Sequence, residues 1–151
     1  MLNLNTNKQT LEKIRKARMV NVRFFSDKAG ITLERALIID TDENIDDVMN
    51  YLEESIDNIN IIHYATKDVY SIVNISELED IHDYVKLEHY WGDVISYVIE
   101  YKDCFGFTDE LCLVANIDCD NNDLITAVNN LNESFEVVNI YEYRDCWVKR
   151  P

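Results

Sequence analysis

Two stretches of the chain nearly repeat each other, and this repetition limits the folds that the sequence can adopt. The first stretch runs from Ile39 to Tyr64 and the second from Ile117 to Tyr143. Each begins with Ile-Asp-x-Asp, continues through an amphipathic segment, and ends in Asn-Ile-x-x-Tyr. Self-similarity of this kind indicates that one supersecondary unit is used twice to build a shared core.

Further positions match outside these stretches when the offset between the two copies is allowed to vary slightly along the chain. Gly30 meets Gly106 at an offset of 76, the acidic corners meet at 78, and the closing apolar runs meet at 79. We therefore predict tandem, pseudo-symmetric αββαβ(β) repeats over residues 1–75 and 76–151, forming either one compact unit or two closely packed subdomains. The fold class is α+β, with mixed β-sheets flanked by helices and joined edge to edge or face to face. Each strand–helix–strand passage should make its two strands parallel.

Hydrophobic periodicity places the elements of the first repeat. We expect helices at 7–17 and 43–57, and strands at 19–25, 31–40, 59–65 and 69–75. Asp42 is interpreted as the N-cap of the second helix. The polar run Thr66–Asp68 is interpreted as a hairpin turn. Because Ala36–Ile39 is apolar on both faces, this strand is predicted to be central in its sheet.

The second repeat is predicted in the same way. Ser76 and Glu79 have the spacing of a capping box and predict a helix at 77–89, which Gly92 follows as a break. The remaining expected elements are strands at 93–101, 110–117 and 135–143, a helix at 122–133, and a short edge strand at 146–149. Helix is the alternative for 93–101, but β-branched and aromatic residues favour a strand there.

Charge is the strongest global feature. The chain has 29 acidic and 14 basic residues, for a net charge of −15. Residues 1–28 carry seven basic and two acidic residues, a net +5, so residues 29–151 carry a net −20. Such a field repels nucleic acids and membranes and attracts basic protein surfaces. With no long apolar run and no signal-peptide pattern, we expect a soluble cytoplasmic protein.

The residues that could carry chemistry form no recognised catalytic pattern. Four cysteines lack the spacing of a zinc site and are interpreted as reduced thiols that pack as small apolar side chains. The corner carboxylates Asp40, Asp42, Asp118 and Asp120 have three interpretations: helix caps, an acidic recognition surface, or a Mg²⁺ or Ca²⁺ site. Caps are the simplest, with a contribution of about 1 kcal/mol each. We expect neither enzymatic activity nor a cofactor.

The acidic helices suggest a binding function. Same-face helix residues lie about 5–6 Å apart, so a row of acids roughly imitates a row of phosphates. We therefore expect binding to the basic groove of a nucleic-acid-binding enzyme, without direct contact to nucleic acid. The acids expected to contact this partner are Asp42, Glu43, Asp46, Asp47, Glu53, Glu54, Asp57, Glu77, Glu79, Asp80 and Asp83.

In size, charge and Asn-, Asp- and Ile-rich composition, the chain resembles the small acidic proteins that phages and mobile elements use against restriction and CRISPR enzymes. The resemblance implies an inhibitor, and it carries over no functional residues because it involves no motif. Three alternatives remain: an immunity or antitoxin protein that neutralises a basic toxin, a regulatory or structural protein whose acids are merely solvated, and a metal-dependent enzyme. A basic N-terminus and an acidic body also suggest a homodimer.

Overall fold

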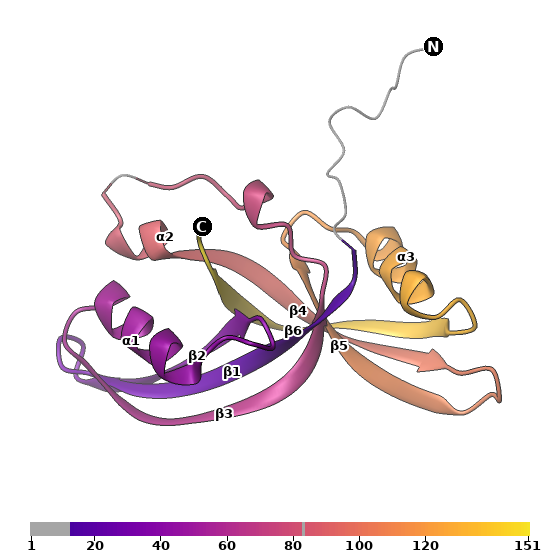
Figure 1. The fold of residues 1–151 in the computed structure, drawn as a ribbon, viewed down its shortest axis with the longest axis horizontal. Coiled ribbons are helices and arrows are strands. Elements are labelled where there is room, and N and C mark those ends of the chain that lie inside the picture. The colour runs from indigo at the N-terminus through magenta and orange to yellow at the C-terminus, as the bar shows by residue number, and fades with distance from the viewer. Residues whose placement is uncertain (1–12, 83) are drawn as a thin grey trace, which may run out of the picture.

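A computed structural model describes residues 13–82 and 84–151, which form an α+β fold with a mixed six-stranded sheet and three α-helices (Figure 1). The elements in chain order are β1 (Arg15–Ser26), β2 (Ile31–Ile39), α1 (Ile45–Ser55), β3 (Ile59–Ser71), the 3-10 turn η1 (Ile75–Glu77), α2 (Lys86–Tyr90), β4 (Trp91–Lys102), β5 (Thr108–Asn116), α3 (Asn121–Leu131) and β6 (Glu136–Lys149). The order strand, strand, helix, strand thus occurs twice.

Long antiparallel ladders hold each half together, and short parallel contacts join the halves. β1 pairs antiparallel with both β2 and β3, and β4 pairs antiparallel with both β5 and β6. β2 meets β6 in parallel only at Leu37 and Ile38, and β3 meets β5 only at Tyr70 and Ser71. The strands therefore close into a ring in the order β1-β2-β6-β4-β5-β3.

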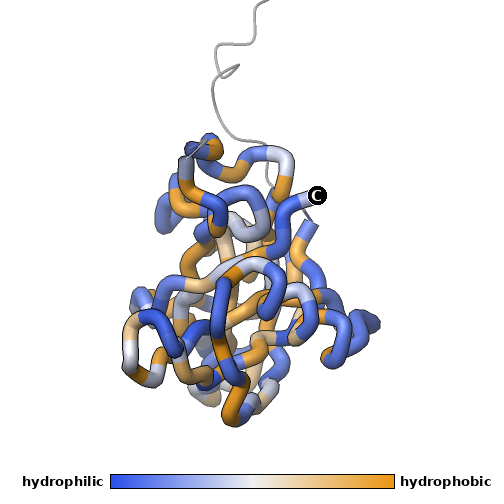
Figure 2. The backbone as a smooth tube through the Cα atoms, turned by 90° about the vertical axis from the view of Figure 1, so that its left-hand side faces the viewer, coloured by the Kyte–Doolittle hydropathy of each residue, from blue (hydrophilic) through white to orange (hydrophobic). Residues whose placement is uncertain are grey.

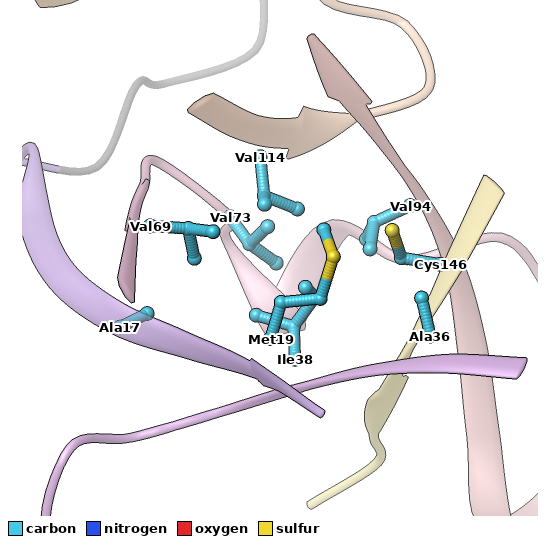
Figure 3. Close-up of a cluster of buried hydrophobic side chains, with 9 residues drawn as sticks. All are labelled: Ala17, Met19, Ala36, Ile38, Val69, Val73, Val94, Val114 and Cys146. Carbon is cyan, nitrogen blue, oxygen red and sulfur yellow. The ribbon is translucent and has the colours of Figure 1, made fainter. Parts of the chain in front are cut away.

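The central core draws side chains from both halves. Figure 3 shows this cluster, in which Met19 lies among aliphatic side chains from several strands. Its members are Ala17, Met19, Ala36, Ile38, Val69, Val73, Val94, Val114 and Cys146. Two further clusters lie beneath α1 and α3, on the other faces of the strands. Each helix-bearing half thus depends on packing against the other.

Strand alternation explains how β1 serves two clusters at once. Val20, Val22 and Phe24 pack in the cluster with α1, whereas Ala17 and Met19 point into the central core. Apolar and polar positions are interleaved along the backbone in Figure 2, as expected for strands and helices that each bury one face. β1 is the middle strand of its half, and the apolar end of β2 pairs with β1 on one side and with β6 on the other, so the predicted central position of this strand end is confirmed. The apolar end of β2 is buried because it also meets β6.

Two predictions in the first half are wrong because strand pairing overrides local patterns. Residues 7–12 of the helix expected at 7–17 lie outside the described residues, but its last residues belong to β1. Thr66–Asp68 forms no turn, because all three residues pair with β1 and β3 continues through them to Ser71. A middle strand of 12 residues provides a long template, and the polar run stays extended along it.

The helix predicted at 77–89 is wrong except at its end, where residues 86–89 belong to α2. The cap at the start is Asn74, whose side chain accepts a hydrogen bond from the Ser76 backbone N–H at 3.1 Å, and the short turn η1 follows directly. Asn116 Nδ2 donates to the carbonyl oxygen of Asn74 at 3.0 Å, and Arg150 Nη2 donates to that of Glu79 at 2.8 Å. These side chains bind carbonyls that a helix would use for its own hydrogen bonds.

Gly92 does not break an element, since it lies inside β4. A Cβ atom at this position would lie 2.6 Å from Leu78 Cδ1, so the glycine leaves room for the segment that precedes α2. The strand interpretation of 93–101 is confirmed. The strand predicted at 135–143 and the separate edge strand at 146–149 are one strand, β6.

The β4–β5 turn presents two aromatic rings to solvent. Asp103 Oδ1 accepts hydrogen bonds from the backbone N–H groups of Phe105 at 2.9 Å and Phe107 at 3.0 Å. Gly106 adopts φ 84°, a left-handed conformation that glycine allows without strain. Phe105 and Phe107 remain 81% and 71% exposed. The turn is therefore ordered by polar backbone contacts while its aromatic side chains stay in water.

The described helices are all too short or too polar to cross a membrane.

Candidate acidic interface

The acids of α1 are displayed by a helix whose other face is buried. Asn44 caps the helix, its Oδ1 accepting from the backbone N–H groups of Asp46 at 2.8 Å and Asp47 at 3.2 Å. Val48, Met49 and Leu52 are buried against the sheet. This packing leaves the carboxylates of Asp46, Asp47, Glu53 and Glu54 exposed to solvent. The helix contains no basic residue, so this face is uniformly negative.

The charge density on α1 approaches that of a nucleic acid strand. Residues 46–54 span about 12 Å of helix axis at about 1.5 Å per residue. Four carboxylates over this length give on average about one charge per 3 Å, against about 3.4 Å for one DNA strand and about 1.7 Å for the duplex, and they lie as two adjacent pairs, at 46–47 and 53–54, about 9 Å apart. The face therefore matches one strand better than it matches a duplex.

The ends of the acidic segment are partly neutralised within the molecule. Glu43 Oε1 lies 3.8 Å from Lys149 Nζ, and Asp57 Oδ1 accepts a hydrogen bond from Lys86 Nζ at 2.9 Å. The hydrogen bond and charge of Lys86 lower the pKa of Asp57. Asp42 is exposed and does not cap α1, so its predicted role as N-cap is wrong. Glu43 and Asp57 are therefore weaker candidates for partner contact than the four acids on the helix, and Asp42 lies before the helix begins.

The remaining predicted acids do not form a helical row. Glu77 ends η1, Glu79 and Asp80 follow in an irregular segment, and Asp83 lies outside the described residues. Glu77 and Glu79 instead line a small groove of about 130 Å³ together with Asp93 and Asp118. α2, the helix that comes after these acids in the sequence, lies beside α1 (Figure 1). The structure thus separates the predicted acids into a helix face and a groove.

Asp93 is the most perturbed acid in this groove, and sequence reasoning did not select it. Although the residue as a whole is exposed, the groove walls partly desolvate its carboxyl group and raise its pKa. The negative charges of Glu79, Asp145 and Glu88 add to the rise in pKa, and Arg150 opposes it. Pairing of β4 with β6 brings Asp93 near Asp145. No local pattern in the sequence marks this convergence.

The two Asp-x-Asp corners lie in different places. Asp40 lines a cavity of about 340 Å³ with Arg15 and Lys149, whereas Asp118 lines the acidic groove. Asp120 caps α3 as predicted, its Oδ1 accepting from the Asp123 backbone N–H at 2.9 Å. Within residues 13–82 and 84–151, no three His, Cys, Asp or Glu side chains converge in a way that could hold a metal ion.

The four cysteines are free thiols. Cys112 and Cys146 pack in or against the central core, which agrees with the prediction that they serve as small apolar residues. Burial raises the pKa of Cys119 to about 11, and nearby Asp123 and Asp118 contribute to the rise. Cys104 is exposed in the β4–β5 turn.

The second long helix provides an internal comparison for the first. α1 and α3 each have 11 residues and begin one residue after their caps, Asn44 and Asp120. Counted from these caps, the exposed acids Asp46, Glu53 and Glu54 of α1 correspond to the exposed amides Asn122, Asn129 and Asn130 of α3. The helices begin 76 residues apart, not 78 as the matched corners predict. Both helices pack by one apolar face, yet only α1 is strongly acidic.

No protein-family model, curated protein or solved structure matches the chain. The interpretation of the acidic interface therefore depends on its own geometry and charge.

Proposed function

We propose that this protein is an acidic inhibitor that imitates a nucleic acid strand and occupies the basic groove of a nucleic-acid-acting protein. An anti-CRISPR or anti-restriction protein of a phage or mobile element is the corresponding biological class. The partner is a basic protein, contacted directly and without bound nucleic acid. The inhibitor performs no reaction and needs no cofactor. Because such enzymes act on intracellular nucleic acid, we also propose a cytoplasmic location.

The observation that carries the proposal is the contrast between α1 and α3. Asparagines occupy the α3 positions that match Asp46, Glu53 and Glu54 and satisfy the same need for a polar outer face, whereas the position that matches Asp47 is the capping-box residue Asp123. Carboxylates are therefore not required for a helix to pack on this sheet. If the acids served solubility alone, we would expect similar numbers of acids on the outer faces of α1 and α3. Their concentration on α1 supports a role in recognising a positively charged partner.

The spacing of the acids supports the choice of partner. The average density along α1, about one charge per 3 Å carried as two pairs of carboxylates about 9 Å apart, is close to that of a single strand. Basic channels that follow a single-stranded backbone use lysine and arginine along a groove, and such a groove complements this helix face. Four exposed carboxylates on a packed helix also cost little conformational entropy to present.

The test uses the native host and a matched pair of variants. The immobilised protein is incubated with host lysate, and captured proteins are identified by mass spectrometry. Affinity is then measured for the purified captured protein. We expect the variant Asp46→Asn/Asp47→Asn/Glu53→Gln/Glu54→Gln to fold, as α3 does with amides, and to bind about 100-fold more weakly.

The control variant adds charge to the other helix. Asn122→Asp/Asn129→Asp/Asn130→Asp should leave the affinity of the captured protein nearly unchanged. Single-stranded oligonucleotide should compete with the wild-type protein, and salt should weaken binding. A captured partner that binds no nucleic acid, or binding that oligonucleotide does not affect, would contradict the proposal.

We further propose that the two halves are pseudo-symmetric tandem repeats of a ββαβ unit. Three features support this: the near-repeated sequence around residues 39–64 and 117–143, the middle position of β1 and β4 in their halves, and helices of equal length. Under this proposal, α1 and α3 descend from one helix, and the acids of α1 mark a function that only one copy carries.

A further inference from the structure

The β4–β5 turn carries an apolar surface that the fold does not bury. Phe105 and Phe107 are 81% and 71% exposed, whereas the other three phenylalanines, Phe24, Phe25 and Phe135, are buried or half-buried. Single exposed apolar residues are common on protein surfaces, but two phenyl rings on one turn form a patch, and buried aromatic side chains dominate the affinity of many protein interfaces. The pair is therefore a candidate contact surface.

The geometry of the turn does not require both rings. Backbone hydrogen bonds to Asp103 Oδ1 and the left-handed conformation of Gly106 order the turn. The β1–β2 turn has the same Asp-x-x-Gly pattern at residues 27–30, and its glycine is also left-handed, at φ 69°. Ala29 stands before that glycine, where Phe105 stands in the β4–β5 turn. A small side chain thus suffices at this position.

The strands that lead to this turn are acidic. Residues 100–110 carry four acids and one lysine, a net −3. Asp109 and Glu110 are exposed, and Glu110 lies directly opposite Glu100 in the ladder between β4 and β5. Like charges at directly opposed positions lower the stability of a sheet. The fold gains nothing from this arrangement, whereas a positively charged partner is attracted by it.

Charge selects among the surfaces that could bury the two rings. A second copy of this turn would bring another net −3 against the first, on molecules that each carry −15. The anionic surface of a membrane repels the turn in the same way. A protein pocket with apolar walls and with lysine or arginine at its rim accepts the rings and also neutralises the acids beside them.

We propose that the β4–β5 turn is a second docking site, which inserts Phe105 and Phe107 into an apolar pocket bordered by cations on another protein. In Figure 1 this turn and α1 lie toward opposite ends of the long axis of the molecule. The turn therefore makes its contact separately from the acidic interface, and the proposal does not depend on the function proposed for α1. Because Asp103 already orders the turn, its backbone loses little conformational freedom on binding.

The test compares several immobilised baits in lysate of the native host. The baits are the wild-type protein, Phe105→Ala/Phe107→Ala, Tyr84→Ala, and the α1 variant with four amides described above. Tyr84 is the matched control, because its ring is 87% exposed and lies outside the turn. We expect a protein that every bait captures except Phe105→Ala/Phe107→Ala. For that protein after purification, Phe105→Ala/Phe107→Ala should raise the dissociation constant by about 30-fold or more.

Two measurements on the purified pair examine the pocket itself. Photoreactive p-benzoylphenylalanine in place of Phe105 should cross-link to apolar residues of the partner that are bordered by lysine or arginine. Asp109→Asn/Glu110→Gln should weaken binding and reduce its dependence on salt, because fewer charges then face the cations of the rim. Far-UV circular dichroism checks that each variant folds.

The alternative occupants give distinct results, each of which would overturn the proposal. A second copy predicts a cross-link from position 105 to another molecule of this chain. A membrane predicts sedimentation with phosphatidylcholine vesicles that the wild-type protein shows and Phe105→Ala/Phe107→Ala does not. If captured proteins are lost only with the α1 variant, the acidic interface is supported and the turn has no docking role.

Discussion

At the residue scale, the groove acid Asp93 is held in an unfavourable state at neutral pH. Partial desolvation and three neighbouring acids raise its pKa, so the folded protein favours the neutral form more than the unfolded chain does. Above the raised pKa, the charged carboxylate therefore opposes folding. As the pH falls through the raised pKa toward the ordinary value of 3.8, this destabilisation disappears.

We predict that Asp93→Asn stabilises the protein at neutral pH by about 0.5 kcal/mol, a modest value because the site is partly solvated. The gain should shrink on acidification, because wild-type Asp93 then becomes protonated and resembles asparagine. Urea denaturation at several pH values measures the difference. Asp80→Asn serves as control, since Asp80 is an exposed acid that does not contribute to the pKa of Asp93. A gain that is independent of pH would contradict this explanation.

At the element scale, the start of α1 depends on Asn44 and not on the corner acid. Asn44→Ala should lower the free energy of unfolding by about 1 kcal/mol, because the backbone N–H groups of Asp46 and Asp47 lose their acceptor. Asp42→Ala should have little effect. Thermal or urea denaturation of the two variants compares them directly. Equal losses, or a larger loss for Asp42→Ala, would restore Asp42 as the cap.

The sequence is a good guide to elements whose pattern and partners agree. β1, β2, β5, α1 and α3 have clear periodicity, and each lies within a few residues of its predicted position. Most of the helix predicted at 77–89 does not form, because Asn116 and Arg150, distant in sequence, donate hydrogen bonds to the backbone carbonyls of Asn74 and Glu79. Thr66–Asp68 stays extended because β1 pairs with it. In both places, long-range contacts decide between local conformations that the sequence alone leaves open.

The candidate interface was predictable to a similar extent. The acids of α1 follow from helical periodicity, since the apolar stripe fixes which face is exposed. The groove around Asp93 does not follow, because its acids come from three separate segments, 77–79, β4 and the corner after β5, that only the sheet topology brings together. The contrast with α3 was also hidden, because the matched corners suggest an offset two residues too large.

At the scale of the whole molecule, the central core makes the two halves depend on each other. Met19 is fully buried among side chains from both halves. We predict that Met19→Ala destabilises the protein by about 3 kcal/mol and preserves a single unfolding transition. Tryptophan fluorescence reports the cluster near α1, which contains Trp91 and Trp147, and hydrogen exchange reports α3.

Both probes should give the same midpoint. The control Ile31→Ala, at a position 52% exposed, should cost about 0.5 kcal/mol or less. Separate transitions for the two probes would show that the halves unfold independently.

The β4–β5 turn has a consequence for colloidal behaviour. Its hydrogen bonds to Asp103 fix two phenyl rings in water, so folding cannot hide them. Collisions between turns are opposed by the long-range repulsion of molecules that carry −15 each. This repulsion vanishes near the isoelectric point of about 4.4. The negative charge that we propose for recognition thus also prevents the exposed phenyl rings of different molecules from associating. Mild acidification should therefore make a solution of fully folded protein turbid.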